Sequence, residues 1–476
     1  METSRVPSGI RGLDEILRGG FVEGLSYLVR GGPGSGKTQI GLHFLTEGAR
    51  LGERVLFVSL ENSEELLQAA FASLPYDFER IAFVSLVQRA EKSGEVYSLF
   101  SPSDLEQDSQ MNGLMAAIDQ HKPQRLFVDG FSQMRLLSPN EFQFRRQVLS
   151  LLAHCYEQGI TTVFSSEVSG DIGDVDLQAM THGVITLRLS VETGRTLEVS
   201  KTLGSAYAEG RHGMTLTSEG VKVFPRLVPI EHGRAFTHDS MPSGIPALDK
   251  MLGGGIERGT VTMITGPNGV GKTTTGLQFM IEAARRDERS VLFTFEEERA
   301  PLLARAEALG QPVRALIEAG SFQVVAVEPL LLSVDEFTWM VRAEVDAGTR
   351  MVMLDSLSGF RMSLKSADMV ERLHALTKYL ERVGVTVLIV NQMEKIISAD
   401  LSVTDYGVSY LADNILLLRY VEMGSEIRRT IGVLKKRMGD FEKTLREFTI
   451  SEQGLQLGEP LVGMQGLLTG LPSKAE

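Results

Sequence analysis

Two short stretches of the sequence have the residue types and spacing that bind phosphate groups. They are GGPGSGKT at 31–38 and GPNGVGKT at 266–273, and both satisfy the phosphate-loop pattern G-x-x-x-x-G-K-[ST]. Glycines let the backbone N–H groups of such a loop, and the start of the helix after it, approach one phosphate closely. We predict that Lys37 and Lys272 reach the β- and γ-phosphates of ATP, and that Thr38 and Thr273 bind Mg²⁺.

The residues around both loops are predicted to bind the nucleotide. A glycine-rich structural turn explains the pattern poorly, because both matches lie between a β-rich run and a helical run. The predicted set is Gly34, Ser35, Gly36, Lys37, Thr38 and Gln39 in the first copy, and Asn268, Gly269, Val270, Gly271, Lys272, Thr273 and Thr274 in the second.

Acidic residues recur after the next apolar run in each copy. The first copy has Glu61-Asn62 and the second has Glu296-Glu297. These positions lie outside the carboxyl ends of parallel strands, where α/β sheets bind ligands. A carboxylate there can accept a proton from the attacking water or hydroxyl, and Glu296 is also a predicted metal ligand. Taken alone, such a pair would more often be a solvated surface, but its recurrence favours the catalytic interpretation.

A third polar element closes two further apolar runs. Asp129 and Asp355 each end one, which suits the Mg²⁺-linked aspartate of a nucleotide hydrolase, although strand-end aspartates also cap helices. Asn391 and Gln392 end the run at 386–390, where they would sense the γ-phosphate or simply be polar loop residues.

The elements that must position these residues are repeated as well. The two loop lysines are 272 − 37 = 235 positions apart, and the PSGI sequences at 7–10 and 242–245 share this offset. We therefore predict two domains, 1–235 and 236–476. Strands alternating with helical stretches indicate an α/β fold, with a mostly parallel twisted sheet flanked by helices in each domain. The predicted strands are 26–30, 55–58, 125–128 and 161–164, then 260–265, 291–295, 351–354 and 386–390, with a further β-rich run at 428–434.

Composition limits the classes of function. The net charge of −13 argues against a broad electrostatic grip on nucleic acid. No apolar run approaches the roughly 18 residues that span a membrane, and the N-terminus has no secretory signal. The single cysteine, Cys155, rules out an intramolecular disulfide, so we expect a cytoplasmic protein.

Taken together, these motifs resemble the KaiC family, the tandem RecA-like ATPases of the cyanobacterial clock. The resemblance rests on the PSGIxxLD sequences, the phosphate loops, FEE at 295–297, LDSL at 354–357 and LADNI at 411–415. It covers nearly the whole chain. It implies ATP-bound double-ring homohexamers with nucleotide between subunits, a first ring that hydrolyses ATP, and a second that phosphorylates its own Ser and Thr. Signalling proteins would be possible partners.

The resemblance also assigns residues in the second repeat. It makes Glu296 and Glu297 the catalytic glutamates, with Lys272 in the loop and Asp355 as the second motif. Lys435 and Arg437 match a basic pair that reaches the neighbouring subunit's nucleotide. The nucleotide-binding set is completed by Arg429 and Lys436, and Ser409 is the implied phosphosite, with Tyr410 in place of the family's adjacent threonine.

The first repeat departs from the family pattern. Glu61 remains as a catalytic candidate, but Asn62 replaces the second glutamate, and the basic pair becomes Lys201 and Leu203. Losing such groups costs roughly 10²–10⁴ in rate each, so we expect slow hydrolysis and a mainly structural ATP in this domain.

Three functions follow from this sequence. The leading one is a hexameric ATPase and serine/threonine autokinase that acts near Ser409. A nucleotide-gated ring scaffold for signalling partners, with little kinase activity, is the first alternative. A RecA-type ATPase on DNA is the second, and the acidic charge speaks against it.

Overall fold

The computed structural model describes residues 4–87, 103–136, 138, 140–168, 174–191, 193–328, 332–364, 369–393, 408–423, 425–462, 464–465 and 473–474. The chain forms two compact units, Met1–Arg226 and Leu227–Glu476, here called the first and second domains. This division falls after Arg226, whereas the sequence repeat sets it after residue 235.

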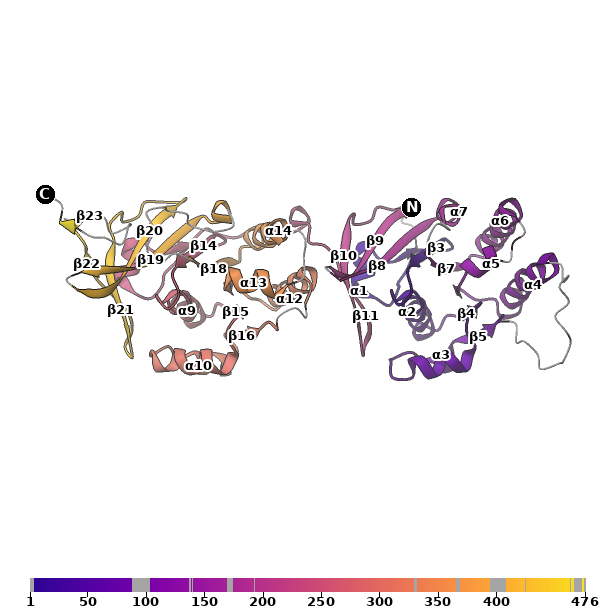
Figure 1. Ribbon diagram of the computed structural model, residues 1–476, viewed down its shortest axis with the longest axis horizontal. Coiled ribbons are helices and arrows are strands. Elements are labelled where there is room, and N and C mark those ends of the chain that lie inside the picture. Colours follow the sequence, from indigo (N-terminus) through magenta and orange to yellow (C-terminus); the bar gives the residue numbers. More distant parts are fainter. Residues whose placement is uncertain are drawn as a thin grey trace. The chain divides into compact units, whose positions relative to one another are not determined.

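The first domain is built on a nine-stranded sheet with the order β11-β10-β9-β8-β3-β7-β6-β4-β5 (Figure 1). Strands from β8 to β5 are parallel, and β8 to β11 are antiparallel. The strands are β1 (Arg5–Val6), β2 (Phe21–Val22), β3 (Ser26–Gly31), β4 (Val55–Ser59), β5 (Ala82–Ser85), β6 (Arg125–Asp129), β7 (Thr161–Glu167), β8 (Gly183–Ser190), β9 (Gly194–Thr202), β10 (Arg211–Thr217) and β11 (Gly220–Phe224). The helices are α1 (Arg11–Ile16), α2 (Lys37–Arg50), α3 (Glu64–Phe71), α4 (Ser103–His121), α5 (Ser132–Leu136), α6 (Glu141–Glu157) and α7 (Val175–Met180), with a 3₁₀ turn η1 (Phe78–Arg80).

The second domain repeats this plan with the order β16-β15-β17-β18-β14-β19-β20-β21-β22. Its strands are β12 (Ser240–Met241), β13 (Ile256–Glu257), β14 (Val261–Gly266), β15 (Ser290–Thr294), β16 (Phe322–Ala326), β17 (Met351–Asp355), β18 (Thr386–Gln392), β19 (Asn414–Met423), β20 (Glu426–Lys436), β21 (Arg446–Ser451), β22 (Gly454–Pro460), β23 (Met464–Gln465) and β24 (Ser473–Lys474). Its helices are α8 (Pro246–Met251), α9 (Lys272–Arg285), α10 (Arg299–Ala308), α11 (Val313–Glu318), α12 (Val334–Asp346), α13 (Leu357–Ser363) and α14 (Met369–Arg382), with 3₁₀ turns η2 (Pro229–Glu231) and η3 (Val408–Leu411). The predicted fold, two tandem α/β domains with mostly parallel, helix-flanked sheets, is confirmed.

Helices cover both faces of each sheet, so the central strands are apolar on both sides. All six residues of β14 are buried. In the second domain, one core lies under α9 and contains Ile264, and the other lies under α12–α14 and contains Met263. Alternate residues of one strand thus fill opposite cores, as expected for a buried parallel sheet.

A glycine lets the phosphate-loop helix lie close to the sheet in both domains. A Cβ at Gly41 of α2 would be 2.3 Å from the Phe127 ring, and one at Gly276 of α9 would be 2.6 Å from the Met353 sulfur. These glycines share the 235-residue offset. Each glycine therefore lets its helix pack closely on β6 or β17, the strands that end in Asp129 and Asp355.

Each antiparallel extension begins with a β-bulge at the same place. The β8–β9 register shifts between Val184 and Ile185, and the β19–β20 register shifts between Ile415 and Leu416. In β20, Leu434 is the extra residue, because Lys435 pairs with Ile415 and Val433 with Leu416.

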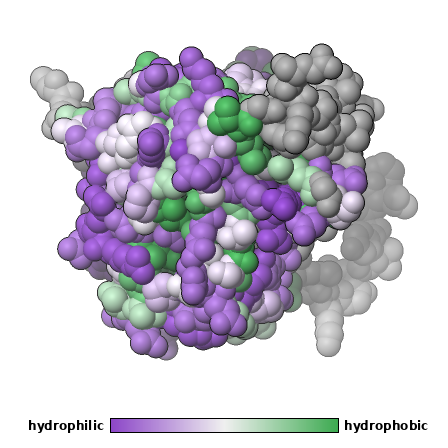
Figure 2. Space-filling view, turned by 90° about the vertical axis from the view of Figure 1, so that its left-hand side faces the viewer, coloured by the Kyte–Doolittle hydropathy of each residue, from purple (hydrophilic) through white to green (hydrophobic). Residues whose placement is uncertain are grey.

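Hydrophilic residues cover most of the second-domain face seen in Figure 2, and hydrophobic residues gather in a hollow near its centre. Within the part of the chain that the structure describes, every helix lacks the length or the apolar character needed to cross a bilayer.

Candidate nucleotide site

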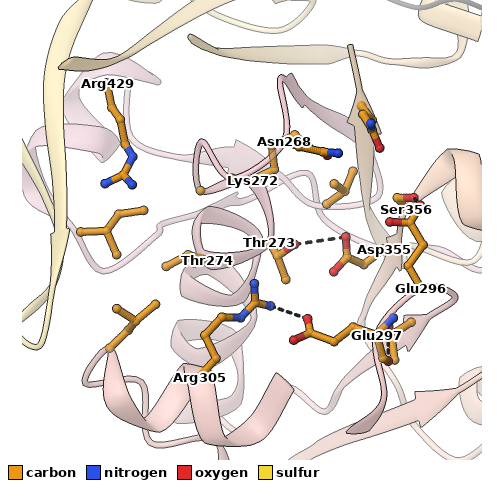
Figure 3. A pocket seen from close by; sticks show the side chains of 17 residues that line it. Asn268, Lys272, Thr273, Thr274, Glu296, Glu297, Arg305, Asp355, Ser356 and Arg429 are labelled. Atoms are coloured by element: carbon orange, nitrogen blue, oxygen red, sulfur yellow. Dashed lines mark hydrogen bonds and ion pairs between the residues drawn. The ribbon is translucent and has the colours of Figure 1, made fainter. Parts of the chain in front are cut away.

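A cavity of about 430 Å³ opens at the carboxyl ends of the parallel strands in the second domain. Ten predicted site residues line it: Asn268, Gly269, Gly271, Lys272, Thr273, Thr274, Glu296, Glu297, Asp355 and Arg429. Lining residues outside the predicted set are Thr294, Arg305, Leu309, Ser356, Val390, Gln392 and Ile450, of which Gln392 was a candidate phosphate sensor. Topology therefore brings together side chains from β15, β17, β20 and the phosphate loop (Figure 3).

The phosphate loop has the backbone shape that its glycines predict. Gly269 and Gly271 adopt φ of 73° and 113°, in the left-handed region that favours glycine. A Cβ at Gly271 would be 2.4 Å from Ile450. Lys272 Nζ donates a hydrogen bond to the Pro267 carbonyl at 2.8 Å, and burial lowers the pKa of Lys272. A phosphate could replace that carbonyl as the acceptor.

The hydroxyl of Thr273 donates to Asp355 Oδ1 at 3.2 Å, which joins the two predicted Mg²⁺-linked groups. Burial raises the pKa of Asp355 to about 6, although the Thr273 hydrogen bond opposes this shift. A nearby cation would favour the ionised form. No group of three or more His, Cys, Asp or Glu among the described residues could hold a metal alone. Bound Mg²⁺ would therefore complete its coordination with water or nucleotide oxygens.

Two glutamates lie beside Asp355 on the same side of the loop (Figure 3). Glu296 accepts a hydrogen bond from the hydroxyl of Ser356, the N-cap of α13. Glu297 forms an ion pair of 2.6 Å with Arg305 of α10. Ser356 follows Asp355 directly in the LDSL motif, but nothing in the sequence linked Arg305 to this site.

Arg429 reaches the cavity from the opposite side, from β20 (Figure 3). Its Nε is buried and has no hydrogen-bond partner among the described residues. A guanidinium with an unpaired, buried Nε beside a phosphate loop fits an anionic ligand.

Ser409 and Lys435 lie at the other edge of the sheet, where the parallel strands begin, opposite the nucleotide cavity. Strand β19 runs parallel to β14 and starts level with it, since Asn414 is opposite Thr262. Ser409 lies in η3, just before β19, and Lys435 pairs with Ile415 at its start. The phosphate loop follows the far end of β14. Six residues at about 3.3 Å each therefore separate Ser409 and Lys435 from the loop by roughly 20 Å.

The basic residues at this edge already have contacts. Lys435 Nζ donates to the Ala412 carbonyl at 2.5 Å, and Arg437 forms an ion pair of 3.1 Å with Asp413. The Arg437 side chain remains 53% exposed. Lys436 is buried in an ion pair of 2.8 Å with Glu257 and lies outside the cavity. Val270 belongs to the phosphate loop, but its side chain is fully buried in the core under α9, so only its backbone is available to a phosphate.

The first phosphate loop has the same local geometry. Gly34 and Gly36 have φ of 67° and 107°. Lys37 Nζ donates to the Gly31 and Gly32 carbonyls at 2.9 and 3.0 Å. The Thr38 hydroxyl donates to Asp129 at 3.1 Å. The sequence-predicted loop residues are therefore assembled here as well.

Other polar atoms at this loop fit a ligand. Ser35 Oγ and Gln39 Oε1 are buried and have no hydrogen-bond partner among the described residues. Glu61 accepts a hydrogen bond of 3.2 Å from Gln133 Nε2. The Asn62 N–H donates to Ser59 Oγ at 2.9 Å, as the Glu297 N–H donates to Thr294 Oγ1 at 3.3 Å, so Asn62 occupies the position of Glu297.

At the edge of the sheet opposite the phosphate loop, the first domain makes the same contacts as the second with different side chains. Lys201 Nζ donates to the Thr181 carbonyl at 2.5 Å, matching Lys435 on Ala412. The Leu203 N–H donates to the His182 carbonyl at 2.8 Å, as the Arg437 N–H donates to that of Asp413.

His182 also takes the side-chain role of Asp413. Its Nδ1 accepts the Ser26 N–H at 3.1 Å, where Asp413 Oδ2 accepts the Val261 N–H at 3.0 Å. Burial, helped by Lys201, lowers the pKa of His182, which keeps this nitrogen available as an acceptor.

Two residues of the first site were missed in the sequence. Arg195 lies six residues before Lys201, as Arg429 lies six before Lys435, and its Nε is likewise buried without a partner among the described residues. Glu167 ends β7 opposite Gly31, whereas Gln392 ends β18 opposite Gly266. Extending the repeat comparison beyond the motifs would have found both.

Comparisons with known proteins find one family twice along the chain. The family model described as "ATPase: KaiC" matches residues 6–228 and again 241–462. The circadian clock oscillator protein KaiC of Parasynechococcus marenigrum is 27% identical over 489 aligned residues, covering 100% of this chain and 94% of the relative. That of Synechococcus elongatus is 27% identical over 479 residues, covering 98% and 91%.

Proposed function

The chain belongs to the KaiC family of ATPases, and we propose that its second domain transfers the γ-phosphoryl group of ATP to Ser409 of a neighbouring copy. The observation that carries this proposal is the separation of the two halves of the site. Lys272, Glu296 and Glu297 lie at one edge of the sheet, and Ser409 and Lys435 lie at the other, on the order of 20 Å away. Two copies arranged head to tail would bring these edges together.

Such a heterologous contact closes into a ring when its rotation divides a full turn evenly. A homohexamer is the ring that the family resemblance implies. Lys435 and Arg437 would then stabilise charge on the neighbour's γ-phosphate, as trans-acting basic residues do in other NTPases. Signalling proteins that bind the ring are proposed partners.

Within the joint site, each residue would have a defined part. The loop N–H groups and Lys272 hold the phosphates, Arg429 faces them from β20, and Thr273 with Asp355 would hold Mg²⁺. Bound Mg²⁺ would neutralise charge on the β- and γ-phosphates. Glu297, held by Arg305, accepts the proton of the attacking hydroxyl. The Ser409 Oγ–P bond forms as the bond from the γ-phosphorus to the β,γ-bridging oxygen breaks, and ADP leaves.

In the first domain we propose that ATP serves mainly as a structural ligand. Asn62 cannot accept a proton as a carboxylate does, and Leu203 carries no charge to a neighbour's phosphate. ATP that binds only the folded, assembled state stabilises it by about 2.7 kcal/mol at one hundred times its Kd.

The test is incubation with [γ-³²P]ATP and Mg²⁺, followed by mapping of the labelled residue. We expect stable label on Ser409 that is absent from Glu297→Gln and from Ser409→Ala. A mixture of Lys272→Ala with Ser409→Ala copies tests transfer between copies, and label on Ser409 of the Lys272→Ala copy is expected. Rings that bind ATP and acquire no label would instead support the nucleotide-gated scaffold.

A further inference from the structure

The end of β7 carries a carboxylate that the second domain lacks. Glu167 is opposite Gly31, the last residue of β3, and Gln392 is opposite Gly266, the last residue of β14. Gln392 lines the nucleotide cavity of the second domain. By this equivalence, Glu167 faces the phosphate position of the first loop.

A second observation places Glu167 near the loop lysine. Lys37 Nζ donates to the carbonyl of Gly31, the residue opposite Glu167. Burial lowers the pKa of Lys37, and of the three carboxylates that oppose this shift, Glu167 acts most strongly, before Asp129 and Glu61. The corresponding lysine, Lys272, responds to Asp355 and Glu296.

The Glu167 carboxylate also has no side-chain partner within the described ranges. Its backbone N–H donates to Ser132 Oγ at 3.4 Å, but the carboxylate makes no hydrogen bond or ion pair with any residue in the described ranges. Glu297, by contrast, is held by Arg305. A half-buried carboxylate without a partner can bind a water molecule.

The two domains therefore have equal numbers of acids in different places. The second has Glu296, Glu297 and Asp355. The first has Glu61 and Asp129 at the matching positions, Asn62 in place of Glu297, and Glu167 on the strand beside the loop strand. Compared with the second domain, the first lacks the second carboxylate after β4 and has one at the end of β7.

We propose that Glu167 is the proton acceptor for the ATP hydrolysis that the first domain retains. The inference rests on the proposed function, in that ATP must occupy the first loop. The water oxygen forms a bond to the γ-phosphorus while its proton passes to Glu167. The bond from that phosphorus to the β,γ-bridging oxygen breaks, and ADP and inorganic phosphate leave.

The experiment uses the full chain with Glu297→Gln, which removes the proposed acceptor of the second domain. Phosphate release is measured at saturating Mg-ATP, and binding of a fluorescent ATP analogue is measured in parallel. Adding Glu167→Gln should lower the turnover at least about tenfold, since a general base contributes roughly 10²–10⁴. Analogue affinity should change less than about threefold.

The matched control is Glu157→Gln, an exposed glutamate at the end of α6, which should leave turnover unchanged. Unchanged or faster turnover in Glu167→Gln would overturn the proposal, as would no turnover in the Glu297→Gln background. Labelling of Ser409 in the wild-type chain tests the proposed kinase function separately, so failure of either claim leaves the other distinguishable.

Discussion

The acids around the two phosphate loops differ more than the loops do. Both lysines donate to loop carbonyls, and both threonines donate to a strand-end aspartate. The loop pattern and the apolar runs identified these residues as phosphate and Mg²⁺ candidates, but they did not predict these contacts. Arg305 was not identified, because its place depends on how α10 packs, and Glu167 lies beyond the predicted run 161–164, where only a wider comparison of the repeats would have found it.

Removing Arg305 should impair catalysis without affecting the fold. Arg305→Ala frees Glu297 from its ion pair of 2.6 Å. Since the Arg305 side chain is 46% exposed, the pair contributes only about 0–1 kcal/mol to stability. We expect the rate of Ser409 labelling to fall several-fold while the melting temperature changes little. Arg299→Ala, an exposed residue at the start of α10, is the control. Equal labelling by both variants would contradict a role for Arg305.

His43 should make the first domain sensitive to acid. Burial lowers the pKa of His43 to about 4 from an unfolded value of 6.5, and its Nε2 accepts the Val221 N–H at 2.8 Å. The unfolded chain binds the proton more readily, so stability is full above pH 6.5 and is lost as the pH falls towards 4, by at most about 3 kcal/mol.

Urea unfolding between pH 4.5 and 7.5 measures this dependence. His43→Gln should flatten it, whereas His121→Gln, at the end of α4, should not. A steep dependence retained in His43→Gln would assign the effect to other groups.

Strands and helices followed from the sequence where their apolar pattern was continuous. The predicted runs at 125–128 and 351–354 became β6 and β17, each one residue longer. The pairing order of the antiparallel strands was not predictable, because an alternating pattern does not identify a neighbour. That Ser409 and Lys272 lie at opposite edges was not predictable either, because it depends on β19 pairing in parallel with β14.

Gly41 should be intolerant of a side chain because α2 lies so close to β6. Alanine favours a helix by about 1 kcal/mol over glycine, but the new Cβ would be 2.3 Å from the buried Phe127 ring. We expect Gly41→Ala to lower the free energy of unfolding of the first domain by about 1–3 kcal/mol. In Gly113→Ala the Cβ meets only the flexible end of Leu86 at 3.0 Å, and stability should hold or rise. Stabilisation by both changes would mean that α2 can move away from the sheet.

At the scale of the full chain, we expect assembly to depend on nucleotide, because each proposed site combines residues from two copies. The repeat alone predicted two domains of one fold, but it could not say which copy kept its chemistry. The proposed difference in chemistry rests on Asn62, Leu203 and Glu167, where the two copies differ.

Lys37→Ala should therefore disrupt assembly, and Lys272→Ala should chiefly disrupt phosphorylation. Lys37 would hold the structural ATP of the first domain, so its loss removes the binding energy that favours the assembled state. Sedimentation velocity with and without Mg-ATP measures the oligomer, and Glu61→Gln, which retains the loop, is the control. Intact oligomers of Lys37→Ala at saturating ATP would show that the first nucleotide is not structural.

The β-bulge before Lys435 adds one residue to β20 and so decides which face of the sheet each later residue occupies. Ile431 and Val433 face the core under α9, and Lys435 would face the same way in an unbroken strand. The extra residue, Leu434, instead turns Lys435 towards Ala412 and gives the inward place to Lys436. A regular strand that kept Leu434 without the bulge would exchange the faces of the two adjacent lysines, whereas deleting Leu434 would leave both faces as they are. The corresponding bulge in β9 gives Lys201 the same place in the first domain, where it donates to the Thr181 carbonyl.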